Sequence, residues 1–263
     1  MLDVKDFAVR FTDRDVEEEA VHGISFTMAS GEILGLVGES GSGKTVTALS
    51  LMGLLRGRQA VTTGQMLFNG QDLLSLSFEQ MRSIQGKQIA MIFQEPKTSL
   101  NPLMKVGRQV EEALRVHTSM SAAERRKRAL EAMESVELPD PERVYRQYPH
   151  ELSGGMRQRA MIAAAILLEP NLLLCDEPTT ALDAHTQEQI LALLTRINRE
   201  RGVGILFISH DLQVVRKLCR RAIVMQDGYI VEQGDVETLF TNPQNAYTKQ
   251  LLDSIPGRGR RRE

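Results

Sequence analysis

The amino-acid sequence predicts an α/β fold, in which helices pack on a mostly parallel sheet and a further helical segment is inserted. Short apolar runs alternate along the chain with stretches of helical spacing, which is typical of parallel strands joined by helices. One loop between such a strand and such a helix also matches a phosphate-binding pattern without a mismatch. The 263 residues are enough for one large α/β domain.

Strands are expected where apolar residues alternate with polar ones or form short uninterrupted runs. Alternation marks residues 2–11 and 20–28, and the charged residues 12–19 between them are expected to form a solvated turn. Further strands are expected at residues 33–37, 64–69, 88–93, 172–175 and 205–208. A helix with one apolar face joins the last two strands, so the strand–helix–strand order predicts that they run parallel.

Residues 97–151 differ from the rest because their apolar residues have the spacing of a helix, as at Leu130, Met133 and Val136. The basic run at residues 125–128 falls on the polar side of this pattern, and we interpret it as a solvated helix face. This stretch is expected to be a helical insertion in an α/β nucleotide-binding core.

A single loop carries the strongest functional signal. It fits the pattern G-x-x-x-x-G-K-[ST] with the residues Gly38, Glu39, Ser40, Gly41, Ser42, Gly43, Lys44 and Thr45. Its glycines let backbone N–H groups turn toward a phosphate, and the helix start that follows favours an anion. Lys44 is expected at the β- and γ-phosphates, and the Thr45 hydroxyl is expected to bind Mg²⁺. The alternative, a flexible Gly/Ser loop, does not account for the strand before the loop or the helix after it.

Two carboxylates, Asp176 and Glu177, follow the buried strand at residues 172–175. The carboxyl end of a strand is where ligands bind in open α/β sheets. Asp176 is expected to hold Mg²⁺, directly or through water, and Glu177 to polarise the attacking water as a general base. Alone, two acids at a strand end are equally well explained as solvated side chains, and it is the phosphate-binding loop that favours the functional interpretation.

The sequence Leu-Ser-Gly-Gly-Met at residues 152–156 opens a predicted helix and resembles the signature motif of ATP-binding cassette (ABC) ATPases. The usual last residue of that motif is Gln, and Met156 stands in its place. Gln94 resembles the family's Q-loop glutamine, a Mg²⁺ ligand, and His210 resembles the switch histidine that senses the γ-phosphate. Residues 181–183 resemble the D-loop, with Asp183 as its acid. The motifs occur in family order and cover nearly the whole chain.

The resemblance implies an ATP hydrolase that works in pairs. Ser153, Gly154 and Gly155 at a helix start would bind the γ-phosphate of ATP held by the partner's loop, so that two cassettes enclose two nucleotides head to tail. ATP binding would close this dimer, and hydrolysis would reopen it. Phe11 would stack on the adenine, the alternative being a core aromatic. Met156 leaves open whether this site is matched in its partner.

The resemblance also implies one P-loop NTPase domain of the ABC type over residues 1–263, with a mostly parallel sheet, an antiparallel β subdomain and an inserted helical subdomain. Residues 1–96 and 152–240 would form the nucleotide-binding core, about 97–151 the helical subdomain, and 241–263 a C-terminal tail.

The subfamily is indicated by two segments. Residues 93–102 and 242–256 resemble importers for peptides and nickel, although Asn245-Ala246 stands where those usually have His-Pro. Many peptide-importer ATPases continue with a cysteine-bearing extension, so the short form of the tail resembles the nickel branch. The arginine-rich residues 258–262 are expected to be a disordered tail with at most a minor contact to anionic lipid.

Composition argues against several other classes of protein. A net charge of −2 provides no general attraction for nucleic acid, and no apolar run approaches the roughly 20 residues that span a bilayer. Cys175 and Cys219 form no disulfide or metal pattern, which indicates a reducing cytosol, and the N-terminus lacks the features of a signal peptide.

The expected function is therefore the energy-coupling ATPase of an ABC importer for peptides or nickel and other metal complexes. Its expected partners are two membrane-spanning permease subunits, a second, related cassette with which it forms a heterodimer, and an extracytoplasmic solute-binding protein. No nucleic acid is expected as a partner. It would sit peripherally on the cytoplasmic face of the inner membrane. The alternatives are an exporter ATPase and a non-transport ABC ATPase of DNA repair or translation.

Overall fold

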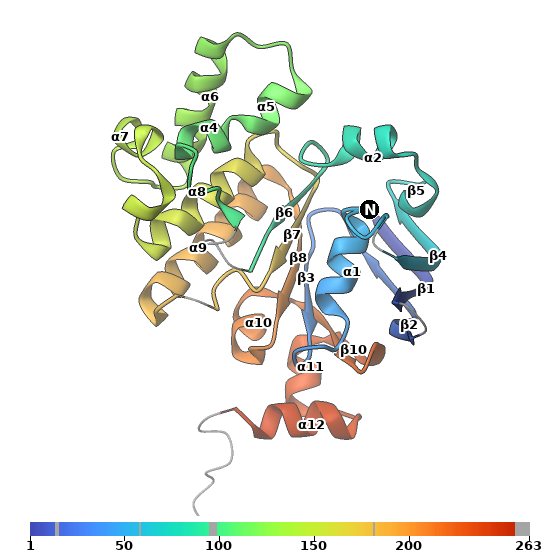
Figure 1. Ribbon diagram of the computed structural model, residues 1–263. Helices are drawn as coiled ribbons and strands as arrows, with labels where there is room; N and C mark the ends of the chain where they lie inside the picture. The colour runs from blue at the N-terminus through green and yellow to red at the C-terminus, as the bar shows by residue number, and fades with distance from the viewer. Residues whose placement is uncertain (14–15, 58, 95–98, 181, 256–263) are drawn as a thin grey trace, which may run out of the picture. The chain divides into compact units, whose positions relative to one another are not determined.

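The computed structural model of the protein describes all residues except 14–15, 58, 95–98, 181 and 256–263 (Figure 1). These residues form two compact units, residues 1–81 with 204–263 (unit 1) and residues 82–203 (unit 2). Within the described ranges, no helix is long and apolar enough to cross a membrane.

An antiparallel sheet in unit 1 has the strand order β2-β1-β4-β5. Its strands are β1 (Leu2–Asp13), β2 (Val16–Met28), β4 (Ala60–Phe68) and β5 (Gln71–Asp72). Alternating apolar and polar residues predicted the first two strands, and the structure shows the reason. Phe7 and Val9 are fully buried on one side of β1, while Arg10 is exposed.

The prediction of a turn at residues 12–19 is wrong for most of this segment. Thr12 pairs with Glu17, and Asp13 pairs with Val16, so both strands continue into this charged segment. An outer hairpin can be polar on both faces and still form its backbone ladder. The ion pair between Arg10 and Glu17, at 3.0 Å, joins the two strands where the sequence suggested solvent.

The phosphate-binding loop is positioned by the parallel strands of unit 1. Strand β3 (Ile33–Val37) lies between β8 (Gly204–Ser209) and β9 (Arg221–Gln226) and is parallel to both, and β10 (Tyr229–Asp235) pairs antiparallel with β9. Strands β9 and β10 were not predicted from the sequence. The helices and one 3-10 turn of this unit are α1 (Lys44–Leu51), η1 (Leu73–Ser75), α10 (Leu212–Leu218), α11 (Val236–Thr241) and α12 (Ala246–Asp253), with α2 (Phe78–Ile84) at its boundary.

Unit 2 combines the parallel pair β6 (Ile89–Ile92) and β7 (Leu172–Asp176) with a set of helices. The helices are α4 (Val106–Val110), α5 (Glu112–His117), α6 (Ala122–Ser135), α7 (Pro141–Arg146), α8 (Gly154–Ile166) and α9 (Ala184–Arg201), with a 3-10 turn η2 (Pro149–Glu151). The α/β fold with parallel strands, an antiparallel part and inserted helices is therefore confirmed.

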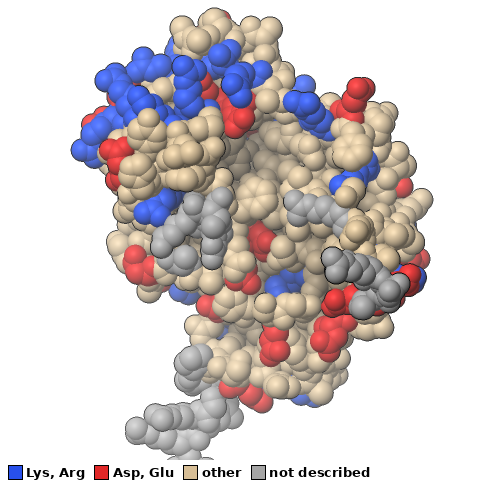
Figure 2. Space-filling view, viewed as in Figure 1, with Lys and Arg blue, Asp and Glu red and all other residues tan. Residues whose placement is uncertain are grey.

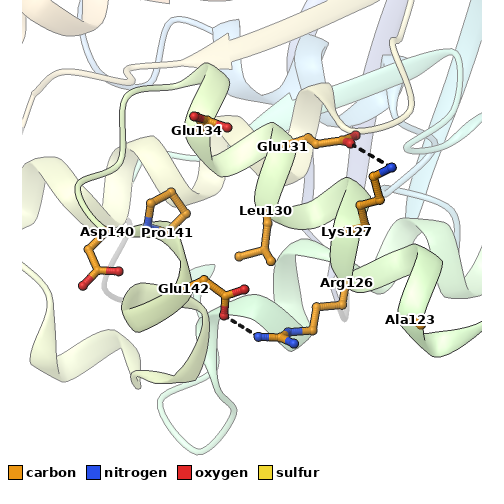
Figure 3. Close-up of a pocket in the computed structure, with 9 residues that line it drawn as sticks. All are labelled: Ala123, Arg126, Lys127, Leu130, Glu131, Glu134, Asp140, Pro141 and Glu142. Carbon is orange, nitrogen blue, oxygen red and sulfur yellow. Dashed lines mark hydrogen bonds and ion pairs between the residues drawn. The ribbon is translucent and has the colours of Figure 1, made fainter.

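The basic run 125–128 is more than the solvated face that we expected. Figure 2 shows Lys and Arg side chains gathered over the part of unit 2 that carries α6 and α7. Arg126 forms an ion pair with Glu142 of α7, and its guanidinium lies over the Tyr145 ring. It also lines a groove of about 550 Å³ between these helices, in which Leu130 lies between charged side chains (Figure 3). The run therefore helps to attach α6 to α7.

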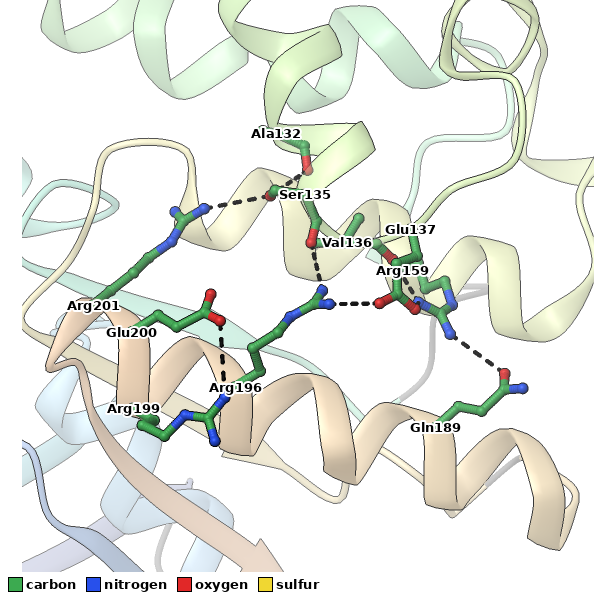
Figure 4. Close-up of polar contacts among 10 residues, drawn as sticks. All are labelled: Ala132, Ser135, Val136, Glu137, Arg159, Gln189, Arg196, Arg199, Glu200 and Arg201. Atoms are coloured by element: carbon green, nitrogen blue, oxygen red, sulfur yellow. Dashed lines mark hydrogen bonds and ion pairs between the residues drawn. The ribbon is translucent and has the colours of Figure 1, made fainter.

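Arginines also hold the other end of α6 (Figure 4). Arg159 of α8 donates to the Val136 carbonyl oxygen at 2.5 Å and to the Glu137 carboxylate at 3.2 Å. Arg196 of α9 donates to the same carboxylate at 2.5 Å and to the Ser135 carbonyl oxygen at 2.7 Å. A helix C-terminus has unpaired carbonyl groups and favours cations, so these arginines fix α6 to α8 and α9.

Candidate functional site

The phosphate-binding loop connects β3 to α1 in unit 1, as the sequence predicted. Its three glycines, Gly38, Gly41 and Gly43, have positive φ angles of 155°, 85° and 97°. A Cβ at Gly38 would lie 2.2 Å from the Met225 carbonyl oxygen, and one at Gly43 would lie 2.9 Å from the Ala20 carbonyl oxygen. Both positions therefore need glycine for space as well as for backbone conformation.

Lys44 is held over this loop although its side chain carries a charge. The residue is 4% exposed, and its Nζ donates to the Glu39 carbonyl oxygen at 2.6 Å and to the Ser42 hydroxyl at 3.1 Å. A buried ammonium needs such acceptors to offset the loss of water. Its position at the start of α1 adds the positive helix end to the same place, which suits a phosphate. Thr45 follows it on α1 and is exposed.

Two other predicted residues, Phe11 and His210, also belong to unit 1. Phe11 lies near the end of β1, opposite Glu18 and Ala60, and is partly exposed, whereas Phe7 is the fully buried aromatic of this strand. Phe11 is thus not a core aromatic, and its role at adenine stays a prediction. His210 directly follows β8 and is exposed.

In unit 2, the structure brings together the predicted general base and the Q-loop glutamine. Asp176 ends β7 and is 3% exposed, and Glu177 follows it with a φ of 45°. Positive φ is uncommon outside glycine and is concentrated at functional sites. Gln94 Nε2 donates to Glu177 Oε2 at 3.0 Å, and the Thr180 hydroxyl donates to the same oxygen at 3.0 Å. Residues 95–98, next to Gln94, lie outside the described residues.

The signature residues begin helix α8, as predicted. The Ser153 hydroxyl accepts from the Met156 N–H at 3.2 Å and so caps the helix, whose first two residues are Gly154 and Gly155. A Cβ at Gly155 would lie 2.8 Å from Thr186 Cγ2 on α9. The absence of a side chain at Gly155 therefore lets the two helix starts pack closely.

Asp183, the predicted D-loop acid, caps α9 at this contact. Its carboxylate accepts from the Thr186 N–H at 2.9 Å and from the Thr186 hydroxyl at 2.7 Å. These hydrogen bonds, the backbone one foremost, lower the pKa of Asp183. The signature and the D-loop thus meet at Thr186, a residue that no motif indicated. Ala181 of the predicted D-loop lies outside the described residues.

The candidate Mg²⁺ ligands are the Thr45 hydroxyl, the Gln94 amide oxygen and the Asp176 carboxylate. All are oxygen donors, which Mg²⁺ prefers. Among the described residues, His, Cys, Asp and Glu side chains form no group of three or more that could hold a metal ion by itself. That is compatible with Mg²⁺, which is usually bound by one or two carboxylates together with substrate phosphates and water.

The sequence and structure have counterparts among known proteins. Residues 21–180 match the model of the ABC transporter family. A probable peptide ABC transporter ATP-binding protein of Sinorhizobium fredii is 50% identical over 264 residues, which covers 100% of this chain and 79% of the relative. An oligopeptide transport ATP-binding protein of Bacillus subtilis is 47% identical over 257 residues, which covers 97% of this chain and 72% of the relative.

Solved structures agree with this match. The dimeric structure of an ATP-binding cassette in a post-hydrolysis state, bound to ADP and Pi, has a TM-score of 0.80 and 30% identity. The match covers 90% of this chain and 99% of the chain in that structure. CbiO1 from Clostridium perfringens, part of the ABC transporter complex CbiONQ, has a TM-score of 0.76 and 26% identity, and the match covers 92% of this chain and 90% of that one.

Proposed function

The chain belongs to the ABC transporter family and is an ATP hydrolase, and on this premise we propose that it is the energy-coupling subunit of a peptide importer. The observation that carries the proposal is the high identity, over nearly the whole chain, to relatives named as peptide and oligopeptide transport ATP-binding proteins. These names favour peptides as the cargo over the nickel or metal complexes that remain the alternative.

The loop at residues 38–45 binds the phosphates of ATP in this proposal. Its backbone N–H groups and the start of α1 attract the anion, and Lys44 adds a positive charge at the β- and γ-phosphates. Phe11 stacks on the adenine. Thr45, Gln94 and Asp176 hold Mg²⁺, which when bound neutralises phosphate charge.

Hydrolysis uses Glu177 as the general base. A water oxygen forms a bond to the γ-phosphorus, the bond from that phosphorus to the bridging oxygen of ADP breaks, and Glu177 takes the proton of the water. His210 senses the γ-phosphate and helps to position the water. Ser153, Gly154 and Gly155 at the start of α8 bind the γ-phosphate held by a partner cassette. ATP therefore closes a head-to-tail dimer, and loss of phosphate reopens it.

Exposed apolar side chains of unit 2 support contact with a membrane partner. Leu103 is 85% exposed, and Phe93 and Val116 are 40% and 46% exposed. Phe93 and Leu103 flank the Q-loop in the sequence, so a permease helix that covers them would connect the membrane part to Gln94. The assembly would contain two permease subunits, a second related cassette and an extracytoplasmic solute-binding protein. The chain would act at the cytoplasmic face of the inner membrane.

The test is to purify the tagged full-length chain from gently solubilised native membranes and to identify its partners. We expect two permeases, a second cassette and a solute-binding protein, and we expect peptides to stimulate ATP hydrolysis by the complex in vesicles. Recovery of ribosomes or DNA without membrane subunits would instead favour a non-transport cassette. Permeases without any solute-binding protein would favour an exporter, and stimulation by nickel complexes alone would reassign the cargo.

A further inference from the structure

The C-terminal helix α12 contacts the phosphate-binding loop directly. Tyr247, on the first turn of this helix, is 8% exposed, and its hydroxyl accepts a hydrogen bond from the Glu39 N–H at 3.0 Å. The two residues are 208 positions apart in the sequence. Glu39 is the second residue of the loop, so a side chain from the tail is bonded to the backbone that surrounds the phosphate site.

Glu39 connects this contact to Lys44. Its N–H donates outward to Tyr247, while its carbonyl oxygen accepts from Lys44 Nζ at 2.6 Å and from the Ser42 N–H at 3.2 Å. Glu39 thus has its N–H bonded to α12 and its carbonyl group bonded to Lys44, the lysine proposed to bind the phosphates. Movement of Glu39 would move the acceptor that holds the ammonium group.

Helix α12 is itself attached to a strand that supports the loop. The Glu232 carboxylate on β10 accepts from the N–H groups of Gln244 and Asn245 at 2.8 and 3.1 Å, just before the helix begins. Asn245 then caps the helix by accepting from the Tyr247 N–H at 2.8 Å. The turn before β10 supports the loop as well, since the Gly228 N–H donates to the Ser42 carbonyl oxygen at 3.3 Å. These bonds hold Tyr247 at a fixed place relative to the loop.

We propose that Tyr247 is a positioning residue for ATP binding, which acts through the Glu39 backbone to hold Lys44 at the phosphates. The inference rests on nucleotide binding at this loop and is independent of the transport role and of the cargo. It gives the C-terminal helix a part in the nucleotide site, whereas the sequence assigned it only to the tail.

The test compares two tyrosine-to-phenylalanine variants of the full-length chain. Tyr247→Phe removes only the hydroxyl that accepts from Glu39. Tyr145→Phe is the matched control, because it removes a hydroxyl that donates to the Glu111 carboxylate at 2.8 Å within unit 2. Affinities for ATP and ADP are measured by calorimetry, the KM and kcat of ATP hydrolysis by a phosphate assay, and backbone exchange of residues 38–43 by hydrogen–deuterium exchange.

Loss of one hydrogen bond to a positioned backbone group predicts roughly a three- to tenfold weaker affinity of Tyr247→Phe for ATP. In ATP hydrolysis, the loss of affinity should appear mainly as a higher KM. The backbone of residues 38–43 should exchange hydrogen for deuterium faster in the absence of nucleotide. Tyr145→Phe should keep the ATP affinity and the loop exchange of the unaltered chain, whatever it does to the melting temperature.

The proposal would be overturned if Tyr247→Phe bound ATP within twofold of the unaltered chain, or if Tyr145→Phe weakened binding equally. Should Tyr247→Phe fail to fold, Glu232→Gln takes its place, because it loosens the attachment of α12 to β10 and leaves the tyrosine intact. Unchanged ATP affinity in a folded Glu232→Gln variant with faster exchange in α12 would likewise contradict it.

Discussion

Gln94 Nε2 and Glu177 Oε2 lie 3.0 Å apart and form a hydrogen bond between side chains that are 83 positions apart in the sequence. Gln94 follows β6 and Glu177 follows β7, and these strands are parallel neighbours, so their carboxyl ends lie side by side. The proposed general base therefore bonds directly to the proposed Q-loop residue. A displacement of the Q-loop would change the hydrogen bonding of the base.

The first prediction concerns these two residues. Glu177→Gln should reduce kcat for ATP hydrolysis by about 10²–10⁴-fold while ATP still binds, because the amide cannot accept the proton of the attacking water. Gln94→Ala should reduce kcat less, since the carboxylate remains and the Thr180 hydroxyl still donates to it at 3.0 Å. Single-turnover hydrolysis and ATP binding, measured on the same preparations, separate chemistry from affinity. A Glu177→Gln variant with normal turnover would remove Glu177 from the role of base.

The second prediction is a pH dependence at the end of α6. The hydrogen bond from Arg196 lowers the pKa of Glu137 below its ordinary value of 4.5. A carboxylate with a lowered pKa in the folded state stabilises the protein above its unfolded pKa, and the effect is lost as the pH falls through the folded pKa. Glu137→Gln should therefore lower the free energy of unfolding by about 0.5–1 kcal/mol near neutral pH. The difference from the unaltered chain should shrink below pH 4.5.

Urea unfolding at several pH values measures this effect. Glu200→Gln is the control, since Glu200 contacts only the exposed Arg199 among the pairs drawn in Figure 4, at 4.0 Å. We expect the control to show no such pH-dependent difference. A Glu137→Gln difference that stayed constant down to acid pH would mean that the ion pairs contribute nothing to stability.

The third prediction tests the packing of α4 against α7. A Cβ at Gly107 would lie 2.1 Å from Cδ2 of the Tyr145 ring, so Gly107→Ala must displace that ring. The displacement would also strain the hydrogen bond from the Tyr145 hydroxyl to Glu111. We expect a loss of about 1–3 kcal/mol in the free energy of unfolding, although alanine favours the helix. Gly234→Ala, where a Cβ would meet nothing within 4 Å, should change it by less than about 0.5 kcal/mol. Equal effects would show that the close approach of Tyr145 is unimportant.

The fourth prediction concerns Leu103, an exposed apolar residue that follows the Q-loop in the sequence. Leu103→Ser should weaken assembly with the permeases by roughly 10- to 150-fold, because a leucine buried at an interface contributes about 1.5–3 kcal/mol. Titration of the purified chain into vesicles that contain the permeases measures this affinity. Phe78→Ser is the control, since Phe78 is 71% exposed but lies on α2, away from the Q-loop in sequence. If both variants assembled like the unaltered chain, Leu103 would not belong to the permease contact.

Local motifs made much of the site predictable from the sequence. The loop at residues 38–45, the acids after β7 and the signature at the start of α8 each depend on a few consecutive residues. Their backbone conformation follows from glycine, from an apolar strand or from a helix cap, and these effects act over a few positions. The roles of these residues in catalysis stay predictions, as do the boundaries of the core and the helical subdomain.

The sequence by itself thus determined the α/β class, the phosphate-binding loop and the order of the motifs, because these depend on local composition and periodicity. Only the tertiary structure decided which distant residues are bonded to one another. It paired Tyr247 with Glu39, Gln94 with Glu177, and Glu137 with Arg159 and Arg196. It also extended the hairpin through residues that the charge pattern assigned to a turn. A hydrogen bond requires two groups about 3 Å apart in a suitable direction, and periodicity along the chain carries no information about such a meeting in space.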